Sequence, residues 1–539
     1  MKATVSKERK RKAKRRHKLA GRDINPHNKA QRPMVALLAA LLTWFMSFVL
    51  FRIPGTQFTV FSQYEHIALD LALDAVLGAT AFIAIGVLLT ILNPQLIRRN
   101  SSVILLCLLC LFSALCSITI LDSATLLSDP WNAIMPFLLP TVFAPLLAAL
   151  LLGAHGAIAV GILSAIILAT YAGRSLPIMA NGILVTVLLA YLVPNIRTRP
   201  KAVKTCLYAG IAQVPIWALL ALQHPGSFRF ELFLAQIGAC VVAAVLAALL
   251  ALLLLPLLEH VFNISTNISL LEFSDLGHPL LQRLALEAPG TYHHSLVVAN
   301  IAQAAAEAIG TNSLEARIAA YFHDIGKLTK PEFFAENILS RPNPHDQLAP
   351  SMSTLIITGH VKEGLSMAQL HKLPACVHRA IQEHHGSSLL QCFHHKAMNA
   401  QQEFELGDPA PRPLDDSQFR YPGPKPSTRI SAIICLADAV EAASRCITKP
   451  TPANLEDLVH DIVRKRLDDG QLDQCELSLR ELSHIKRVFV FTLANMLHGR
   501  VAYPDHHENN NPKPPEGEPR QPEPSAPIAA ATDATRATA

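Results

Sequence analysis

Apolar positions are concentrated in the first half of the chain, in long runs separated by short polar segments. A membrane's hydrocarbon core, about 30 Å thick, is crossed by about 20 apolar residues in a helix. Eight stretches approach that length, at residues 34–53, 71–92, 102–121, 134–152, 157–172, 176–194, 205–222 and 231–258. We therefore expect residues 34–258 to form a membrane domain with about eight transmembrane helices.

The charges between these stretches indicate which loops face the cytosol. Basic residues follow the second and sixth stretches, at Arg98, Arg99, Arg197, Arg199, Lys201 and Lys204, whereas Asp122 and Asp129 follow the third. Because Lys and Arg are retained on the cytosolic side, everything after Glu259 is predicted to be cytosolic. Asp70 and Asp74 lie at the start of the second stretch, near its outer end, and we expect an interfacial role for them rather than an ion path.

Composition excludes a single soluble globule, because only 16% of the residues are charged and the mean hydropathy is +0.30. The basic segment 1–33 could bind nucleic acid, but its place before the first apolar stretch favours attachment to anionic membrane lipid. We therefore expect lipid and no nucleic acid polymer as a partner. Residues 501–539, rich in Pro, Glu and Asn, are predicted to be a disordered tail.

The second half of the chain has the charge content of an ordinary globular protein. It is predicted to contain a connecting helical segment, 259–290, and an all-helical domain, 291–500, since no segment alternates with period two. Helices are expected near 291–309, 313–325, 351–359, 374–385, 429–446, 454–468 and 475–498. Gly310 and Gly386 are expected to end two of them, and Asn312 or Ser313 to cap the next.

Five histidines and two aspartates recur along these helices in the order H, HD, H, HH, D. They are His294, His323, Asp324, His360, His384, His385 and Asp438. Any one of these histidines taken alone is more often a satisfied core residue than a ligand. Together they are the ligand types that hold first-row divalent metals, and no cysteine adjoins them as a structural zinc site would favour.

The adjacent pair His323 and Asp324 allows two ions, because neighbouring side chains on a helix point about 100° apart. One ion can use the imidazole while the carboxylate bridges to a second ion. Two divalent cations bring four positive charges, of which Asp324 and Asp438 neutralise two. The remaining charge suits a phosphodiester anion together with a hydroxide.

At this point the chain resembles the HD-domain metal-dependent phosphohydrolases, and within them the PgpH-type seven-transmembrane HD proteins. The resemblance is carried by YFHDIGK (321–327), GHVKEG (359–364), EHHG (383–386), YPGPKP (421–426) and LADAVEAASR (436–445), and by LLEFSDLGHPLLQRLALEAPGTYHHSLVVAN (270–300) and NPHD (343–346). It implies an all-α protein in which a polytopic transmembrane helical bundle precedes a cytosolic all-helical HD domain. It also implies a bacterial inner-membrane phosphodiesterase that opens cyclic di-AMP to pApA.

The same resemblance implies roles for individual residues. His294, His323, Asp324 and Asp438 would hold one metal, and Asp324 would bridge to a second metal held by His360, His384 and His385. Two divalent ions, manganese or iron, are the implied cofactors. Lys327 and Asp324 are the implied catalytic residues, with Lys327 reaching the scissile phosphate. For Lys327 considered alone, a solvated lysine at a helix end is an alternative.

Two features depart from the family pattern. The large extracytoplasmic domain usual in the family is replaced here by residues 54–69, and Ile430 stands where the family tends to have an acid. The loop Tyr421 to Pro426 could border the nucleotide pocket or be a simple turn. An alternative function is a non-catalytic membrane receptor whose HD fold binds a nucleotide or a partner, and a homodimer is a further expectation. Hydrolysis of another phosphoester, such as cyclic di-GMP, is a third hypothesis.

Overall fold

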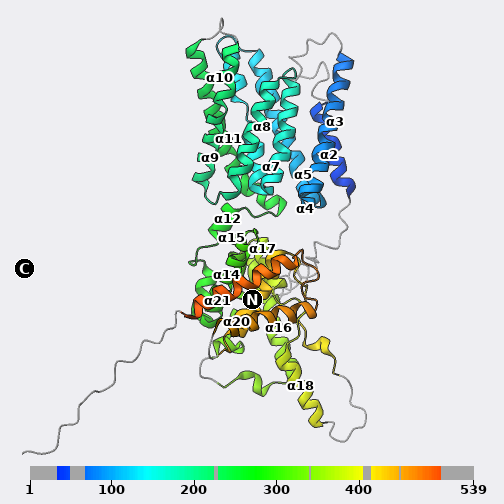
Figure 1. The fold of residues 1–539 in the computed structure, drawn as a ribbon, viewed down its shortest axis with the longest axis vertical. Coiled ribbons are helices and arrows are strands. Elements are labelled where there is room, and N and C mark those ends of the chain that lie inside the picture. The colour runs from blue at the N-terminus through cyan, green and yellow to red at the C-terminus, as the bar shows by residue number, and fades with distance from the viewer. Residues whose placement is uncertain are drawn as a thin grey trace, which may run out of the picture.

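The computed structural model describes residues 33–48, 67–223, 229–338, 342–404, 414–447 and 451–498. Within these ranges the chain is helical, and the one strand-like pairing is an isolated bridge between Leu389 and Arg420. A bundle of long helices lies above a second helical body along the long axis of the molecule (Figure 1). The basic segment 1–33, except for Pro33, and the tail 501–539 lie outside the described residues.

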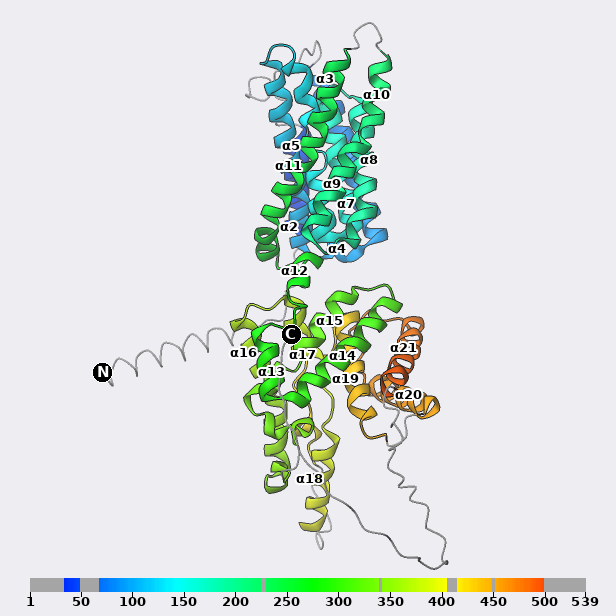
Figure 2. The same ribbon diagram turned by 90° about the vertical axis from the view of Figure 1, so that its left-hand side faces the viewer.

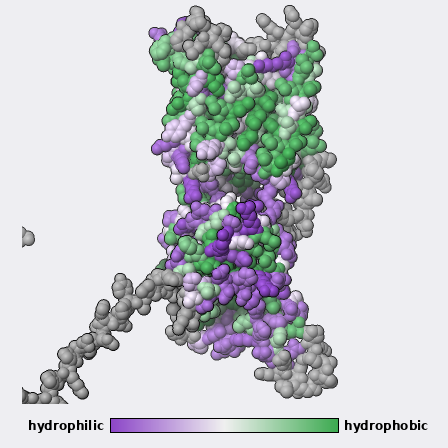
Figure 3. Space-filling model, in the orientation of Figure 1, coloured by the Kyte–Doolittle hydropathy of each residue, from purple (hydrophilic) through white to green (hydrophobic). Residues whose placement is uncertain are grey.

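The upper body is an apolar helical bundle. Its main helices are α2 (Pro33–Phe48), α3 (Ile67–Leu92), α5 (Asn100–Thr125), α7 (Phe143–Tyr171), α8 (Leu176–Leu192), α9 (Arg199–Ala212), α10 (Val214–Gln223) and α11 (Phe230–Phe262). Of the described segments, five are long and apolar enough to cross a membrane, and two shorter apolar helices accompany them. Leucines and isoleucines stay exposed on the bundle surface, Ile91 and Leu253 among them, and the upper body is predominantly apolar on the face seen in Figure 3. Lipid accounts for that exposed apolar surface.

The longest apolar segment is broken at Gly153. This glycine has φ +78 inside α7, a left-handed conformation that a residue with a Cβ adopts only with strain. The break falls between the predicted stretches 134–152 and 157–172, which are joined only by residues 153–156. The total of eight membrane crossings remains a prediction.

The acidic residues at the start of α3 pair with a single arginine. Arg174, in the loop between α7 and α8, lies 3.2 Å from carboxylate oxygens of both Asp70 and Asp74. The arginine is half exposed whereas Asp74 is buried, so the cluster lies at an end of the bundle rather than along its interior. This arrangement supports the interfacial role expected for the two aspartates.

The lower body consists of shorter helices. They are α12 (Asn267–Glu272), α13 (Pro279–Glu287), α14 (Pro289–Ala308), α15 (Ser313–Phe322), α16 (Pro350–Leu370), α17 (Ala375–Glu383), α18 (Gln391–Phe404), α19 (Arg429–Ser444), α20 (Pro452–Asp468) and α21 (Leu479–His498). Helix α14 is central, because it packs against α13, α15, α19 and α21 and buries Val298, Ile301 and Ala302 completely. This part of the fold agrees with the all-helical prediction.

Several helices differ from the sequence prediction. Helix α15 ends at Phe322 rather than near 325, so His323 and Asp324 lie just beyond its regular part. Helix α16 continues to Leu370 instead of ending near 359, and Gly364 lies inside it, where the backbone of Gly326 packs closely against the helix. Helix α18 is absent from the sequence prediction because its sequence QCFHHKAMNAQQEF is mostly polar. By contrast, Gly310 and Gly386 adopt positive φ as expected, and the Asn312 side chain caps α15 by accepting from the Glu315 amide.

The two bodies meet through the loops that carry the basic residues. Arg199, at the start of α9, lies 2.8 Å from Glu272 of α12, and Gln95 of the short helix α4 (Pro94–Arg98) donates to Glu476 near α21. In Figure 2 α4 and α12 both lie at the end of the bundle that faces the lower body. The basic loops that follow the second and sixth apolar stretches therefore lie on the same side as the lower body.

Candidate metal centre

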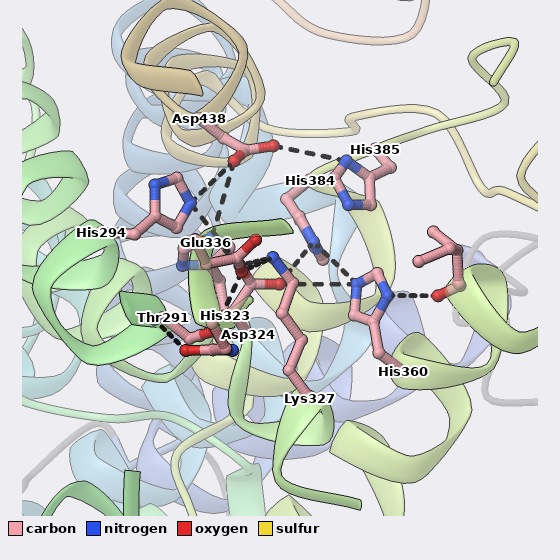
Figure 4. A network of polar contacts seen from close by, with 12 residues as sticks. Thr291, His294, His323, Asp324, Lys327, Glu336, His360, His384, His385 and Asp438 are labelled. Carbon is pink, nitrogen blue, oxygen red and sulfur yellow. Dashed lines mark hydrogen bonds and ion pairs between the residues drawn. The ribbon is translucent and has the colours of Figure 1, made fainter. Parts of the chain in front are cut away.

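All seven predicted histidines and aspartates converge in the lower body. His294 comes from α14, His360 from α16 and Asp438 from α19, while two adjacent pairs directly follow helices. His323 and Asp324 follow α15, and His384 and His385 follow α17, which packs against α15. The side chains point toward one another from these separate elements (Figure 4). Six of the seven residues are buried and His385 is partly buried.

The seven residues form two groups of four that share Asp324. One group contains His294, His323, Asp324 and Asp438, and the other contains Asp324, His360, His384 and His385. Within each group the possible ligand atoms all lie within 4.8 Å of one another. The two oxygens of Asp324 are divided between the groups, because Oδ2 lies 3.2 Å from His323 Nε2 and Oδ1 lies 3.5 Å from His360 Nε2. Asp324 is thus placed to bridge two ions.

Backbone carbonyls orient three of the imidazoles. The Nδ1 atoms of His323 and His360 lie 2.7 Å from the carbonyl oxygens of Ala320 and Ile357, and Nδ1 of His384 lies 2.9 Å from that of Ala380. A carbonyl can only accept, so Nδ1 donates its proton in each ring and Nε2 is the nitrogen that faces the site. Nε2 is therefore the atom through which each ring would bind a metal, in place of any proton it carries.

The two aspartates are held as anions. Although burial opposes ionisation, the charges of His323 and Lys327 keep the pKa of Asp324 well below its usual value. Burial, with a contribution from His384, lowers the pKa of His360 to about 4. His323 behaves differently: burial opposes its charge, but Asp324 and Asp438 raise its pKa to about 10. The carboxylates therefore favour positive charge in the centre, and divalent cations would supply it.

Unsatisfied buried atoms at the centre also fit metal binding. Nε2 of His323 and Oδ1 of Asp324 are buried and lack a hydrogen bond of good geometry, whereas Oδ2 of Asp324 has the Lys327 ammonium as its ion-pair partner. A buried polar atom without a hydrogen bond is costly. Imidazole nitrogen and carboxylate oxygen are a donor set that accepts manganese or iron, so the residues present fit two such ions.

Lys327 is not a solvated lysine. Its Nζ lies 2.8 Å from Asp324 Oδ2 and 2.7 Å from Glu336 Oε1, and only 12% of the side chain is exposed. Burial opposes the charge, but the two carboxylates raise the pKa of Lys327 above its usual value. The reading of Lys327 as a surface residue at a helix end is therefore wrong; contact with a substrate remains a proposal.

Sequence reasoning missed Glu441, which supports His294. Glu441 Oε2 lies 2.5 Å from His294 Nδ1, and Oε1 of the same carboxylate accepts from Arg445 at 2.8 Å. A carboxylate behind an imidazole orients the ring and increases its basicity toward a metal. The position was detectable in principle, since Glu441 lies three residues after Asp438, nearly one helical turn, inside the quoted motif LADAVEAASR.

The loop beginning at Tyr421 also contacts the centre. The Tyr421 ring is buried against His385, with the ring centroids 4.1 Å apart, and Glu383 fixes the loop by accepting from the Ser427 amide and hydroxyl. The loop is therefore more than a turn between helices, because it restrains the ring of one candidate ligand.

Metal binding is expected to stabilise the folded chain. An ion that binds only the folded state at a hundred times its Kd adds about 2.7 kcal/mol, which corresponds to a rise of about 5–10 °C in the melting temperature of a domain this size. The measurement is thermal unfolding of the detergent-solubilised chain in manganese and in chelator. Asp324→Asn should remove most of the difference, and a wild-type protein that melts at the same temperature in both solutions would argue against the site.

Comparison with known proteins agrees with this architecture. A family model described as a 7TM receptor with intracellular HD hydrolase matches residues 67–266, and a model of the HD domain matches residues 291–443. The cyclic-di-AMP phosphodiesterase PgpH of Bacillus subtilis is 39% identical over 308 residues, or 57% of this chain and 42% of the relative. PgpH of Listeria monocytogenes is 32% identical over 375 residues, or 68% of this chain and 50% of the relative. The chain thus spans half or less of the length of these relatives.

Solved structures of the Listeria monocytogenes PgpH HD domain are also similar. The domain alone is 39% identical with a TM-score of 0.38, and the match covers 41% of this chain and 100% of that domain. The second is the same domain in complex with cyclic-di-AMP, with equal identity and TM-score and 99% coverage. Fold and site define a membrane protein whose helical bundle is joined to an HD domain. The chain belongs to the family of seven-transmembrane HD-domain proteins that includes PgpH.

Proposed function

We propose that the chain is a membrane-anchored phosphodiesterase that uses two divalent metal ions to hydrolyse cyclic di-AMP to pApA. The main observation that supports this proposal is the pair of four-residue groups that share Asp324. The names of the PgpH relatives, and the cyclic-di-AMP complex of one of their HD domains, support this choice of substrate. Manganese or iron is proposed because both ions accept mixed imidazole and carboxylate ligands.

Two bound cations would lower the pKa of a water molecule and neutralise charge that develops on the phosphoryl oxygens. The protein's own residues prepare the site for this reaction. His294, His323, Asp324 and Asp438 would hold one ion, and Asp324, His360, His384 and His385 the other. The charges of Lys327 and Glu336 cancel in an ion pair beside the site, as do those of Arg445 and Glu441. The site with its ions therefore keeps about two positive charges for the substrate.

The proposed reaction is an ordinary hydrolysis. Water adds its oxygen to one phosphorus, the bond from that phosphorus to the 3′ oxygen breaks, and the 3′ oxygen takes a proton. Opening one of the two phosphodiester bonds yields the linear dinucleotide. Lys327 is proposed to contact a phosphate oxygen, because its ammonium lies 2.8 Å from the carboxylate shared by the two groups.

We further propose that the HD domain lies in the cytosol beneath the bacterial inner membrane. The contacts of Gln95 and Arg199 bring the basic loops against the HD domain, and loops rich in Arg and Lys stay in the cytosol. This orientation would expose the site to substrates in the cytosol.

A substrate panel tests the proposed reaction. The purified full chain with manganese is expected to convert cyclic di-AMP to pApA faster than it cleaves cyclic di-GMP, as measured by chromatography of the products. Preference for cyclic di-GMP would replace the proposed substrate and keep the reaction class. Metal-loaded protein that binds cyclic di-AMP without cleaving any dinucleotide would instead support the receptor alternative.

A further inference from the structure

The Lys327 ammonium sits between two carboxylates, of which Asp324 belongs to the candidate metal centre. The other, Glu336, lies in the short 3₁₀ segment Ala335–Asn337 and is not a member of either four-residue group. The Lys327 side chain also passes over the ring of Phe334, with Nζ 5.1 Å from the ring centroid. Lys327 is therefore held at the margin of the centre by Asp324, which belongs to the centre, and by Glu336 and Phe334, which do not.

Glu336 is held in place by a hydrogen bond from Thr291, which is fully buried at the start of α14. The Thr291 hydroxyl donates to Glu336 Oε1 at 2.9 Å and accepts from Asn337 Nδ2 at 2.9 Å. Asn337 Oδ1 in turn accepts from the Thr291 amide at 3.2 Å. A Cβ at the neighbouring Gly290 would lie 1.9 Å from the Glu336 carbonyl oxygen, so only glycine allows this close approach. The segment is thus fastened to the helix that carries His294 one turn later (Figure 4).

Metal binding would change the balance of forces on Lys327. Both Asp324 oxygens point into the two groups, so bound cations would take up the charge that now attracts the ammonium. The same cations would repel Lys327, because like charges at short range are strongly unfavourable in a buried site. Glu336 is the carboxylate that remains available to hold Lys327 in place.

We propose that Glu336, anchored by Thr291, is a positioning residue that keeps the Lys327 ammonium beside the metal centre so that it can meet a phosphate oxygen of the substrate. Glu336 itself contacts neither metal nor substrate. This inference rests on the proposed phosphodiesterase function, and it predicts that Glu336 acts only through Lys327.

The test is a double-mutant cycle on the full chain, made with Glu336→Gln, Lys327→Met and both together. Gln keeps the shape and can still accept from Thr291, but it loses the charge that holds the ammonium. We expect Glu336→Gln to lower kcat/KM for cyclic di-AMP about tenfold or more, with the manganese content unchanged. In the Lys327→Met background the same substitution should have almost no further effect.

Glu332→Gln is the matched control, because Glu332 is an exposed carboxylate in the same loop. It is expected to match the wild type. Thr291→Val is a second route to the same defect, since it removes the hydroxyl that anchors Glu336 and leaves both charged residues intact. Melting temperatures of all variants report any loss of folding.

Binding of inorganic phosphate to the manganese-loaded chain separates this inference from the proposed reaction, because it needs no turnover. Calorimetry should show weaker phosphate binding by about tenfold in Lys327→Met and in Glu336→Gln, without a further loss in the double variant. Failure to cleave cyclic di-AMP, with this binding pattern present, would refute the substrate and leave the positioning role intact. Equal effects of Glu336→Gln with and without Lys327, or wild-type behaviour of Glu336→Gln, would overturn the role, as would a wild type that binds no phosphate.

Discussion

Asp324→Asn is expected to lower the hydrolysis of cyclic di-AMP by at least about a thousandfold. Asp324 is the one residue that belongs to both four-residue groups, and its two oxygens serve different groups. Asparagine offers a single neutral oxygen, so neither group keeps its charge balance. Loss of the ions removes both water activation and phosphoryl charge stabilisation, effects that account for most of the rate in two-metal hydrolases. The measurement pairs initial rates with metal content per chain.

Asp346→Asn is the control for this substitution. Asp346 is exposed, pairs with Lys396 and is absent from both groups, so its loss should leave rate and metal content unchanged. Because Asp324 is buried beside Lys327, its replacement also leaves a buried ammonium with one carboxylate fewer, and the melting temperature must be recorded. The double substitution His323→Ala with Asp324→Ala should be as inactive. A folded Asp324→Asn protein that kept both ions and near wild-type turnover would contradict the site.

Glu441→Gln is expected to weaken metal binding by about ten- to a hundredfold and to lower activity at limiting manganese by a similar factor. Glu441 contacts Nδ1 of His294, the ring nitrogen that points away from the other candidate ligands. Although burial raises the pKa of Glu441, His294 and Arg445 keep it below its usual value. The anion therefore strengthens His294 as a ligand, and glutamine keeps the contact without the charge. Activity measured against manganese concentration should shift to higher concentration.

Excess manganese should restore much of the activity of Glu441→Gln, because the substitution leaves all seven candidate ligands in place. Arg445→Gln is expected to act in the same direction with a smaller effect, since it removes only the partner of Glu441. Glu307→Gln, an exposed position on the His294 helix, is the control. A loss of maximal rate that manganese cannot restore would show that Glu441 acts in the reaction itself rather than on metal affinity.

Several features of this protein could be predicted because they depend on local pattern. Apolar runs of about 20 residues mark membrane helices whatever their neighbours are, so most of the bundle was visible in the sequence. The pairs His323–Asp324 and His384–His385 were visible for a related reason, since adjacent ligands are positioned by the ends of single helices. Capping by Asn312 also depends only on the next three residues. Helix α18 was missed because its sequence is mostly polar.

The sequence by itself determined the two-part architecture and the seven candidate ligands. Only the tertiary structure shows these ligands close together, because His294 and Asp438 meet across 144 residues of chain, although the family resemblance already implied their division into two groups. It also decided that Lys327 is buried between Asp324 and Glu336 rather than solvated, and that Glu441 stands behind His294. Charge pairing inside a protein depends on which helices pack together. That packing brings together segments that are far apart along the chain, and their separation in the sequence does not predict the contact.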